Sequence, residues 1–210
     1  MIVAIDGLAA SGKGTLAKRL AAELGFAHLD SGLIYRAVGW KVLQDGGQDL
    51  ESAAIMAAIT LRPEDLNNPD LRTEIVAQAA SKVAAIPEVR KAVLGFQRDF
   101  AKNPPDGAGG AVLDGRDIGT VVCPDAEVKI FVTASQEVRA ERRFKELKPG
   151  HPDLSFEAVA ADIAERDRRD TEREVAPAVA APDAHLLDTT NLSIDSVVAE
   201  AKALVLGARL

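Results

Sequence analysis

The stretch that decides the fold is residues 2–15, Ile2-Val3-Ala4-Ile5-Asp6-Gly7-Leu8-Ala9-Ala10-Ser11-Gly12-Lys13-Gly14-Thr15. A short apolar run breaks into a glycine-rich loop, and a lysine and a helix-forming segment follow. Glycine lets the backbone turn so that successive N–H groups face an anion. The next helix adds partial positive charge at its N-terminus, and Lys13 adds a point cation. The pattern therefore predicts a phosphate-binding loop made of Gly7, Leu8, Ala9, Ala10, Ser11, Gly12, Lys13, Gly14 and Thr15.

This loop departs from the usual motif at one position. Gly14 stands where a serine or threonine normally follows the lysine, and Thr15 comes one residue later. The missing hydroxyl is the group that ligates magnesium directly in such loops. A chance Gly/Ala-rich turn is the alternative interpretation, and the strand before the loop and the helix after it disfavour it.

Composition limits the class of protein. The 210 residues are enough for one α/β domain, with 47% hydrophobic and 27% charged residues. The single cysteine, Cys123, excludes a disulfide framework, fits a cytoplasmic protein and is expected to be a small buried hydrophobe. The sequence shows neither a basic leader nor a long apolar run, so neither export nor a membrane span is expected. A net charge of −7 argues against a nucleic-acid binder.

Basic residues concentrate in one region, about 136–173. A break at Pro149–Pro152 divides it into two predicted helices, which resemble a mobile hairpin able to close over a ligand. Neighbouring acids could make these charges a solvated face with local ion pairs. Arginine predominates, however, and suits oriented phosphate contacts. The basic residues are Arg139, Arg142, Arg143, Lys145, Lys148, Arg166, Arg168, Arg169 and Arg173.

The rest of the chain alternates apolar strands and helical segments, which predicts a parallel sheet covered on both faces. Residues 45–71 are the least regular part, with a loop at Gly46-Gly47 and irregular backbone from Pro63 to Pro69. Strands are expected at 2–6, 26–30, 111–114, 128–132 and 185–188. Helices are expected at about 13–24, 32–44, 51–59, 72–85, 88–102 and 193–206.

A second motif, Asp114-Gly115-Arg116-Asp117, follows a predicted strand. Ligands of open parallel sheets bind at the carboxyl ends of the strands. A carboxylate there, close to the phosphate loop, is expected to organise magnesium. With Gly14 in the loop, we expect the metal to keep several water molecules and Asp114 to hold them. A plain Asp-Gly turn would not explain why Arg116 and Asp117 follow directly.

Together these motifs resemble the bacterial cytidylate kinases, a branch of the nucleoside monophosphate kinases with a phosphate-binding loop. Matching segments run from residue 2 to about 203, so the resemblance covers nearly the whole chain. The most distinctive are Asp114-Gly115-Arg116-Asp117-Ile118-Gly119-Thr120 and Leu29-Asp30-Ser31-Gly32 with Tyr35-Arg36. Further matches are Ala79-Ala80-Ser81 with Pro87 and Arg90, Glu165-Arg166-Asp167 with Asp170 and Arg173, Val175-Ala176-Pro177, and Asp188-Thr189-Thr190.

The resemblance implies a fold and an activity. The fold is a three-layer α/β/α kinase, 1–210, with a central parallel five-stranded sheet, a monophosphate-binding region at about 31–105 and an arginine-rich lid at about 136–173. The activity is Mg²⁺-dependent phosphoryl transfer from ATP to CMP or dCMP, with Lys13, Asp114, Arg139, Arg142 and Arg143 as the catalytic set. An accepting phosphate needs no general base, so catalysis is positioning and charge neutralisation.

The resemblance also implies roles for the residues that bind CMP. Asp117 accepts from the exocyclic amine of cytosine, as a carboxylate pairs with a C4 amine. Uracil, with a carbonyl there, leaves Asp117 unpaired and is rejected. Ser81 and Arg90 read the other polar edge of the ring. The complete set is Ser31, Tyr35, Arg36, Ser81, Arg90, Gly115, Arg116, Asp117, Arg166, Asp170 and Arg173. His28, His151 and His185 lack the spacing of a metal site or triad and are expected to be structural.

Two departures from the family pattern bear on the site. Related loops commonly have Pro-Ser-Gly where this chain has Leu8-Ala9-Ala10, and the lost glycine matters only if φ at position 10 is positive. Many relatives also insert a β-rich subdomain near residues 60–70. Here Leu61-Arg62 is followed almost at once by Pro69-Asp70, so the monophosphate-binding subdomain is predicted to be reduced.

Other functions remain open on the sequence alone. A kinase for UMP or AMP is the nearest, and a kinase for a non-nucleotide small molecule needs a base to activate a hydroxyl. A regulatory module that binds a nucleotide without turnover should be able to lose its lid arginines, which this chain keeps. No heptad pattern or apolar stripe suggests a partner helix, so a monomer is expected.

Overall fold

A parallel sheet forms the centre of the computed structural model, which describes residues 1–46 and 49–208. The strand order is β2-β3-β1-β4-β5, and every pairing is parallel. This confirms the predicted α/β fold with a five-stranded parallel sheet. The strands are β1 (Ile2–Gly7), β2 (Ala27–Asp30), β3 (Ala111–Gly115), β4 (Val128–Thr133) and β5 (His185–Asp188).

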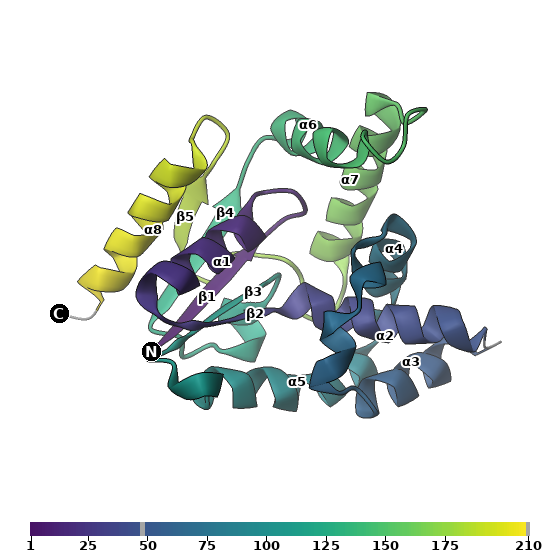
Figure 1. Cartoon of the computed structure of the whole chain (residues 1–210), viewed down its shortest axis with the longest axis horizontal. Helices are drawn as coiled ribbons and strands as arrows, with labels where there is room; N and C mark the ends of the chain where they lie inside the picture. Colours follow the sequence, from purple (N-terminus) through teal and green to yellow (C-terminus); the bar gives the residue numbers. More distant parts are fainter. Residues whose placement is uncertain (47–48, 209–210) are drawn as a thin grey trace.

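Helices cover both faces of the sheet and extend past one edge (Figure 1). One buried apolar cluster lies between the sheet and α1 and α8, and a second lies between the sheet and α2, α3 and α5. The helices are α1 (Lys13–Leu24), α2 (Ser31–Asp45), α3 (Leu50–Ile59), α4 (Glu74–Val83), α5 (Pro87–Lys102), α6 (Gln136–Leu147), α7 (Phe156–Glu172) and α8 (Ile194–Gly207).

Several helices begin where the sequence supplies a side-chain cap. The carboxylate of Asp30 accepts from the Leu33 N–H at the start of α2, and Ser135 and Ser155 cap α6 and α7 in the same way. Such caps satisfy N–H groups that have no partner within the helix. Since Asp30 ends β2 and caps α2, the strand passes into the helix without a connecting loop.

The irregular segment after α3 differs from the expectation in detail. Residues 63–72 form two short 3-10 helices, η1 (Pro63–Asn67) and η2 (Pro69–Arg72), each started by a proline. The helix expected over 72–85 is shorter, because Thr73 is extended and α4 begins at Glu74. The loop expected at Gly46-Gly47 is described only to Gly46, which ends α2 with a positive φ of 60°, and Gly47 lies outside the described residues.

The sequence reading also missed a turn of π-helix, η4 (Ile118–Val122), that follows β3. Its first two N–H groups donate to the carboxylate of Asp6, at 2.8 Å from Ile118 and 2.7 Å from Gly119. Burial is the largest influence on Asp6 and raises its pKa to about 6. The end of β1 thus fixes the chain immediately after Asp117.

The two helices α6 and α7 form a hairpin that lies beyond the carboxyl ends of the central strands (Figure 1). They are joined by a small apolar cluster that includes Ala140, Val159 and Ile163, with Phe144 packed edge-on against Phe156. The break at Pro149–Pro152 separates them as expected. Within the described part of the chain, no helix is long and apolar enough to cross a membrane. Cys123 is buried, as expected.

Candidate functional site

The phosphate-binding loop connects β1 to α1 with two residues that only glycine suits. Gly7 has φ +154°, and a Cβ on it would lie 2.2 Å from the Val132 carbonyl oxygen of the neighbouring strand. Gly12, with φ +91°, sits directly before the first turn of α1. The loop therefore presents the N-terminus of α1 toward the carboxyl end of the sheet, where an anion is stabilised.

Ala10, in the middle of this loop, has a φ of 56°. A positive φ at position 10 is the case in which the loss of the family's glycine matters. Left-handed backbone costs a non-glycine residue roughly 1–2 kcal/mol. The Ala10 methyl group packs against the apolar cluster that joins α6 and α7. This contact offsets part of the strain and ties the loop to the hairpin.

Substitutions at Ala10 should separate these two effects. We expect Ala10→Gly to change the free energy of unfolding by no more than about 1 kcal/mol, because strain relief opposes lost packing and added chain entropy. Ala10→Val should cost about 2–3 kcal/mol, since a β-branched residue is a marked outlier at positive φ. Urea titration of both variants checks this. A valine variant as stable as the parent would show that the loop does not hold this conformation.

Two cavities meet at the loop. The larger, about 1160 Å³, runs along the loop and the start of α1 to Thr189, Leu192 and Ile194. The smaller, about 310 Å³, lies between β2, β3, α2, α4 and α7. Both are lined by Ala10, Lys13, Gly14, Asp30, Arg72, Arg143 and Glu146, which therefore mark their junction.

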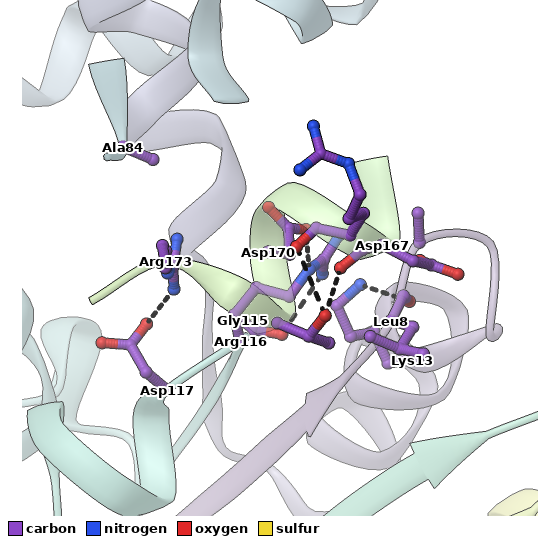
Figure 2. A network of polar contacts seen from close by, with 12 residues as sticks. Leu8, Lys13, Ala84, Gly115, Arg116, Asp117, Asp167, Asp170 and Arg173 are labelled. Carbon is purple, nitrogen blue, oxygen red and sulfur yellow. Dashed lines mark hydrogen bonds and ion pairs between the residues drawn. The ribbon is translucent and has the colours of Figure 1, made fainter. Parts of the chain in front are cut away.

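The smaller cavity gathers every residue predicted to bind the monophosphate. They come from segments far apart in the chain: the start of α2, α4, α5, the end of β3 and α7. Figure 2 shows Arg116 beside Asp170, and Arg173 beside Asp117. The lining includes Ser31, Tyr35, Arg36, Ser81, Arg90, Gly115, Arg116, Asp117, Arg166, Asp170 and Arg173.

The guanidinium groups of this cavity are crowded and poorly solvated. Burial, followed by repulsion from Arg116, lowers the pKa of Arg166 to about 10. Burial also lowers the pKa of Arg36 and Arg173, each of which is further repelled by a neighbouring arginine. The buried Nε of Arg166, Nη2 of Arg173 and Oγ of Ser81 have no hydrogen-bond partner among the residues that the structure describes. Cations held together without enough partners stabilise a bound anion.

The far end of the smaller cavity carries a charge network suited to a polar ring. The Asp117 carboxylate pairs with Arg90 and lies 3.7 Å from Nη2 of Arg173. Arg90 also lies over the ring of Tyr35, 5.4 Å from its centroid. Burial raises the pKa of Tyr35 to about 12, so its hydroxyl stays protonated. The network offers a carboxylate, a hydroxyl and an aromatic face in one place.

Lys13 lies at the junction of the two cavities. Its Nζ donates to the Leu8 carbonyl oxygen at 3.4 Å (Figure 2), and burial, followed by repulsion from Arg116, lowers its pKa to about 7. No ion pair is recorded for this ammonium among the described residues. Asp114 and Asp30 act on this ammonium without pairing with it directly, so its position at the junction suits a bound anion.

This arrangement predicts proton uptake when a triphosphate binds. At about pH 8, one unit above the lowered pKa, the free ammonium is mostly neutral, and an adjacent polyphosphate restores its charge. Calorimetry of ATP binding in buffers of different ionisation enthalpy should show uptake approaching one proton. Lys13→Arg should abolish the uptake, because its guanidinium is always protonated. Equal heats in all buffers for the parent protein would contradict this prediction.

Asp114 ends β3 and faces the loop. Its carboxylate is buried; Oδ1 accepts from His28 at 2.7 Å, and Oδ2 lies 3.7 Å from the position that a Cβ on Gly14 would take. Asp30 lies beside it at the end of β2, since the two pair in the sheet register. Carboxylate oxygens next to a phosphate loop are the donors that magnesium prefers, so the residues present fit this metal.

The lid arginines divide into two groups. Arg142 lines the larger cavity and Arg143 lines both. Arg139, predicted with them, is buried and lines neither cavity. It donates to the Ala9 carbonyl oxygen at 3.2 Å and pairs with Asp167 at 2.6 Å. Its position on α6 turns it toward α7 and the loop backbone, so here it fastens the hairpin to the phosphate loop.

Arg142 and Arg143 are also engaged. Arg142 donates to the Thr189 carbonyl oxygen at 2.7 Å and to its hydroxyl at 2.9 Å, and Arg143 pairs with Glu74 and Glu146. Gly7 and Leu8 of the predicted phosphate-loop set lie behind the cavities, whereas Ala9, Ala10, Ser11, Gly12, Lys13, Gly14 and Thr15 line one or both.

Four residues of the site were missed from sequence. Arg72 lines both cavities, and Glu74 holds Arg143 from across the cleft. Asp6 anchors the turn that follows Asp117, and His28 holds Asp114. A carboxylate in the β1 run and a histidine two residues before Asp30 were visible signals, but their partners are distant in sequence.

Comparison with known proteins gives a consistent result. The family model for cytidylate kinase matches residues 3–206. A cytidylate kinase of Paramagnetospirillum magneticum is 60% identical over 205 residues, 97% of each chain, and one of Azorhizobium caulinodans is 58% identical over 209 residues, 100% of each. A crystal structure of an uncharacterized protein from Eubacterium ventriosum shares the fold, with a TM-score of 0.57, 12% identity and coverage of 100% of this chain and 98% of that one.

Proposed function

The chain belongs to the cytidylate kinase family, and from this membership we infer that it transfers the terminal phosphoryl group of ATP to the 5′-phosphate of CMP or dCMP. One structural observation supports the assignment most directly. Two cavities meet at Lys13, and the smaller contains every residue expected to bind the monophosphate. A donor and an acceptor phosphate can therefore meet end to end beside one cation.

We assign CMP to the smaller cavity. Its phosphate is placed against Arg36, Arg116 and Arg166, whose crowded charges need an anion. Its base is placed against Ser81, Arg90 and Asp117, where the carboxylate accepts from the C4 amine. Asp170 and Arg173 are assigned to the sugar side. Tyr35 supplies the aromatic wall of the base site.

We assign ATP to the larger cavity, with its phosphates along residues 10–15 and its base toward Leu192, Ile194 and Val197. The accepting phosphate oxygen is already a nucleophile, so no general base is needed. Lys13 and Arg143 at the junction neutralise the charge that spreads over the transferred group. The loop and the helix N-terminus hold the donor in line, which supplies most of the remaining rate.

We assign to the lid hairpin, about 136–173, the role of excluding water from the reacting phosphates. It reaches the monophosphate-binding region, about 31–105, through Arg143–Glu74 and through Gln78, which bonds Asp162 and Arg169. A closed hairpin keeps the donor from hydrolysis. The pairs on Arg143 also keep its guanidinium oriented toward the junction.

Asp114, with Asp30 beside it, is assigned to hold magnesium through water. When bound, the ion supplies Lewis-acid stabilisation of the phosphate oxygens. Since Gly14 provides no hydroxyl, the carboxylates carry the whole of the protein's contribution to that ion. We further propose that the protein acts as a monomer in the cytoplasm, since its sequence has no heptad pattern or apolar stripe for a partner helix and its single cysteine fits a reducing compartment.

A coupled ADP-release assay with ATP and magnesium tests this function. CMP and dCMP should be turned over fast, and UMP and AMP slowly. Turnover of UMP or AMP in preference to CMP would reassign the base site. Binding of ATP with no phosphorylation of any of these monophosphates would leave only a nucleotide-binding module.

A further inference from the structure

His28 is a residue that the sequence reading set aside as structural, yet it touches the carboxylate assigned to magnesium. Its Nε2 lies 2.7 Å from Asp114 Oδ1, and its ring is 24% exposed beside a carboxylate that is only 4% exposed. An ionised carboxylate can only accept, so the imidazole donates this hydrogen bond. No other side chain of the described residues bonds to that carboxylate.

The sheet register makes this contact a consequence of the fold. In β2 and β3, His28 lies opposite Val112 and Asp30 lies opposite Asp114. Val112 belongs to the apolar cluster beneath α1. Because side chains alternate along a strand and register partners share a face, His28, Asp30 and Asp114 all point to the α1 side. The His28 ring can therefore reach Asp114 diagonally across two strands.

The contact selects one orientation of the carboxylate. With Oδ1 held by His28, Oδ2 is the oxygen next to Gly14 at the head of α1. The Asp114 main chain is held as well, because the Ser31 hydroxyl donates to its carbonyl oxygen at 2.7 Å. Asp30 brings a second negative charge close by, and burial together with Asp114 raises its pKa. A donor on the far oxygen offsets this repulsion.

We propose that His28 is a positioning residue for the kinase reaction: it fixes the Asp114 carboxylate so that its free oxygen holds the water shell of the nucleotide-bound magnesium. The role has particular weight in this chain, since Gly14 replaces the hydroxyl that would otherwise anchor the ion directly. Groups that orient metal-holding side chains typically contribute ten- to hundredfold in metal affinity. The inference rests on the proposed function and on the role given there to Asp114.

The test compares two substitutions of His28, one that removes the hydrogen-bond donor and one that removes the aromatic ring. His28→Phe keeps the ring and loses the donor, whereas His28→Gln loses the ring and keeps an amide donor. Manganese binding to the complex with a non-hydrolysable ATP analogue, followed by electron paramagnetic resonance, should weaken about tenfold in the phenylalanine variant. The glutamine variant should recover most of that loss. His185→Phe, an exposed histidine on the edge strand β5, serves as the matched control.

Kinetics provide the second readout. His28→Phe should need more magnesium for half-maximal rate, with an unchanged KM for CMP and a kcat restored at high magnesium. Equal manganese affinity in the parent and both variants would overturn the inference, and so would equal weakening in both, which indicates packing alone. Should the phenylalanine variant fail to fold, His28→Leu, which also lacks a donor, takes its place in the comparison with the glutamine variant.

Asp114→Asn distinguishes this inference from the function on which it rests. Weaker manganese binding in Asp114→Asn with no change in His28→Phe removes only the histidine from the argument. Unchanged binding in Asp114→Asn removes the role of the carboxylate, and with it that of His28, while CMP turnover by the parent protein still supports the kinase. Absence of CMP turnover by the parent protein would refute the function itself.

Discussion

Replacing Lys13 with methionine should lower kcat by about a hundred- to a thousandfold, the usual effect of removing one preorganised group that stabilises transition-state charge. Lys13 lies where the two cavities join, which is the place proposed above for the transferred phosphoryl group. The KM for CMP should change less, because the monophosphate is proposed to be held mainly by arginines. Steady-state kinetics with varied CMP at saturating ATP measure both effects.

The same substitution should leave the free protein at least as stable near neutral pH. Burial lowers the pKa of Lys13 from 10.5 to about 7, so the folded chain binds this proton less tightly than the unfolded chain. That cost is absent above the unfolded pKa, grows as the pH falls and is complete below the folded pKa. Methionine removes this cost and keeps an unbranched side chain that is only one atom shorter.

Urea denaturation at pH values around the folded and the unfolded pKa of Lys13 checks this dependence of stability on pH. Lys13→Met should gain most over the parent near pH 7 and little above the unfolded value of 10.5. Lys91→Met, an exposed lysine on α5, is the control and should alter neither kcat nor stability by much. A methionine variant with near-parent kcat would remove Lys13 from the mechanism, and one that is destabilised near neutral pH would contradict the argument from burial.

Replacing Asp117 with asparagine should change which base the enzyme accepts. Asparagine offers an amide that can donate to the O4 carbonyl of uracil, whereas the carboxylate can only accept from the C4 amine of cytosine. The preference for CMP over UMP should fall about ten- to a hundredfold, since one good base contact contributes roughly 1–3 kcal/mol of discrimination. The measurement is the ratio of kcat/KM for CMP and UMP.

Asp117 also has a structural role, and the choice of variant separates the two. Its carboxylate pairs with the buried Arg90 and approaches Arg173. Asp117→Ala, which leaves both cations without this partner, should destabilise the fold by about 3–5 kcal/mol. Asp117→Asn keeps the shape and a hydrogen-bonding oxygen and should cost less. Glu88→Gln, an exposed acid at the start of α5, controls for charge alone.

The outcomes for Asp117 are decisive in both directions. A lower CMP preference in a folded asparagine variant supports the assignment of base recognition to this carboxylate. An unchanged preference places the discrimination on Ser81 and Arg90 instead. An alanine variant that is as stable as the parent would show that the two arginines do not depend on Asp117 in the free protein.

Ion pairs within the protein already engage two arginines of the site. Glu74 on α4 pairs with Arg143 on α6, and Asp170 on α7 accepts from Arg116 at 2.8 Å. Under the proposed function, bound phosphates would compete for these arginines, and part of the energy of substrate binding would go into this exchange of partners.

The sequence by itself determined the fold class and the composition of the site. Periodic apolar runs set five strands and most helices, and the caps and prolines fixed many helix starts within a residue or two. The resemblance to the cytidylate kinases also named the residues proposed to bind the monophosphate, and all of them line the smaller cavity. These features depend on local pattern and on residue chemistry, which a single chain displays directly.

Only the tertiary structure decided which partner each of these side chains has. Arg139, Arg142 and Arg143 cannot be told apart by sequence on one helix, but the packing of α6 on α7 directs Arg139 to Asp167 and the Ala9 carbonyl oxygen, away from both cavities. Ala10 takes a left-handed backbone because the loop must bend there, whatever residue it carries. His28 meets Asp114 because β2 pairs with β3 in one register. Each of these facts depends on contacts between segments distant in sequence, whose geometry no local pattern contains.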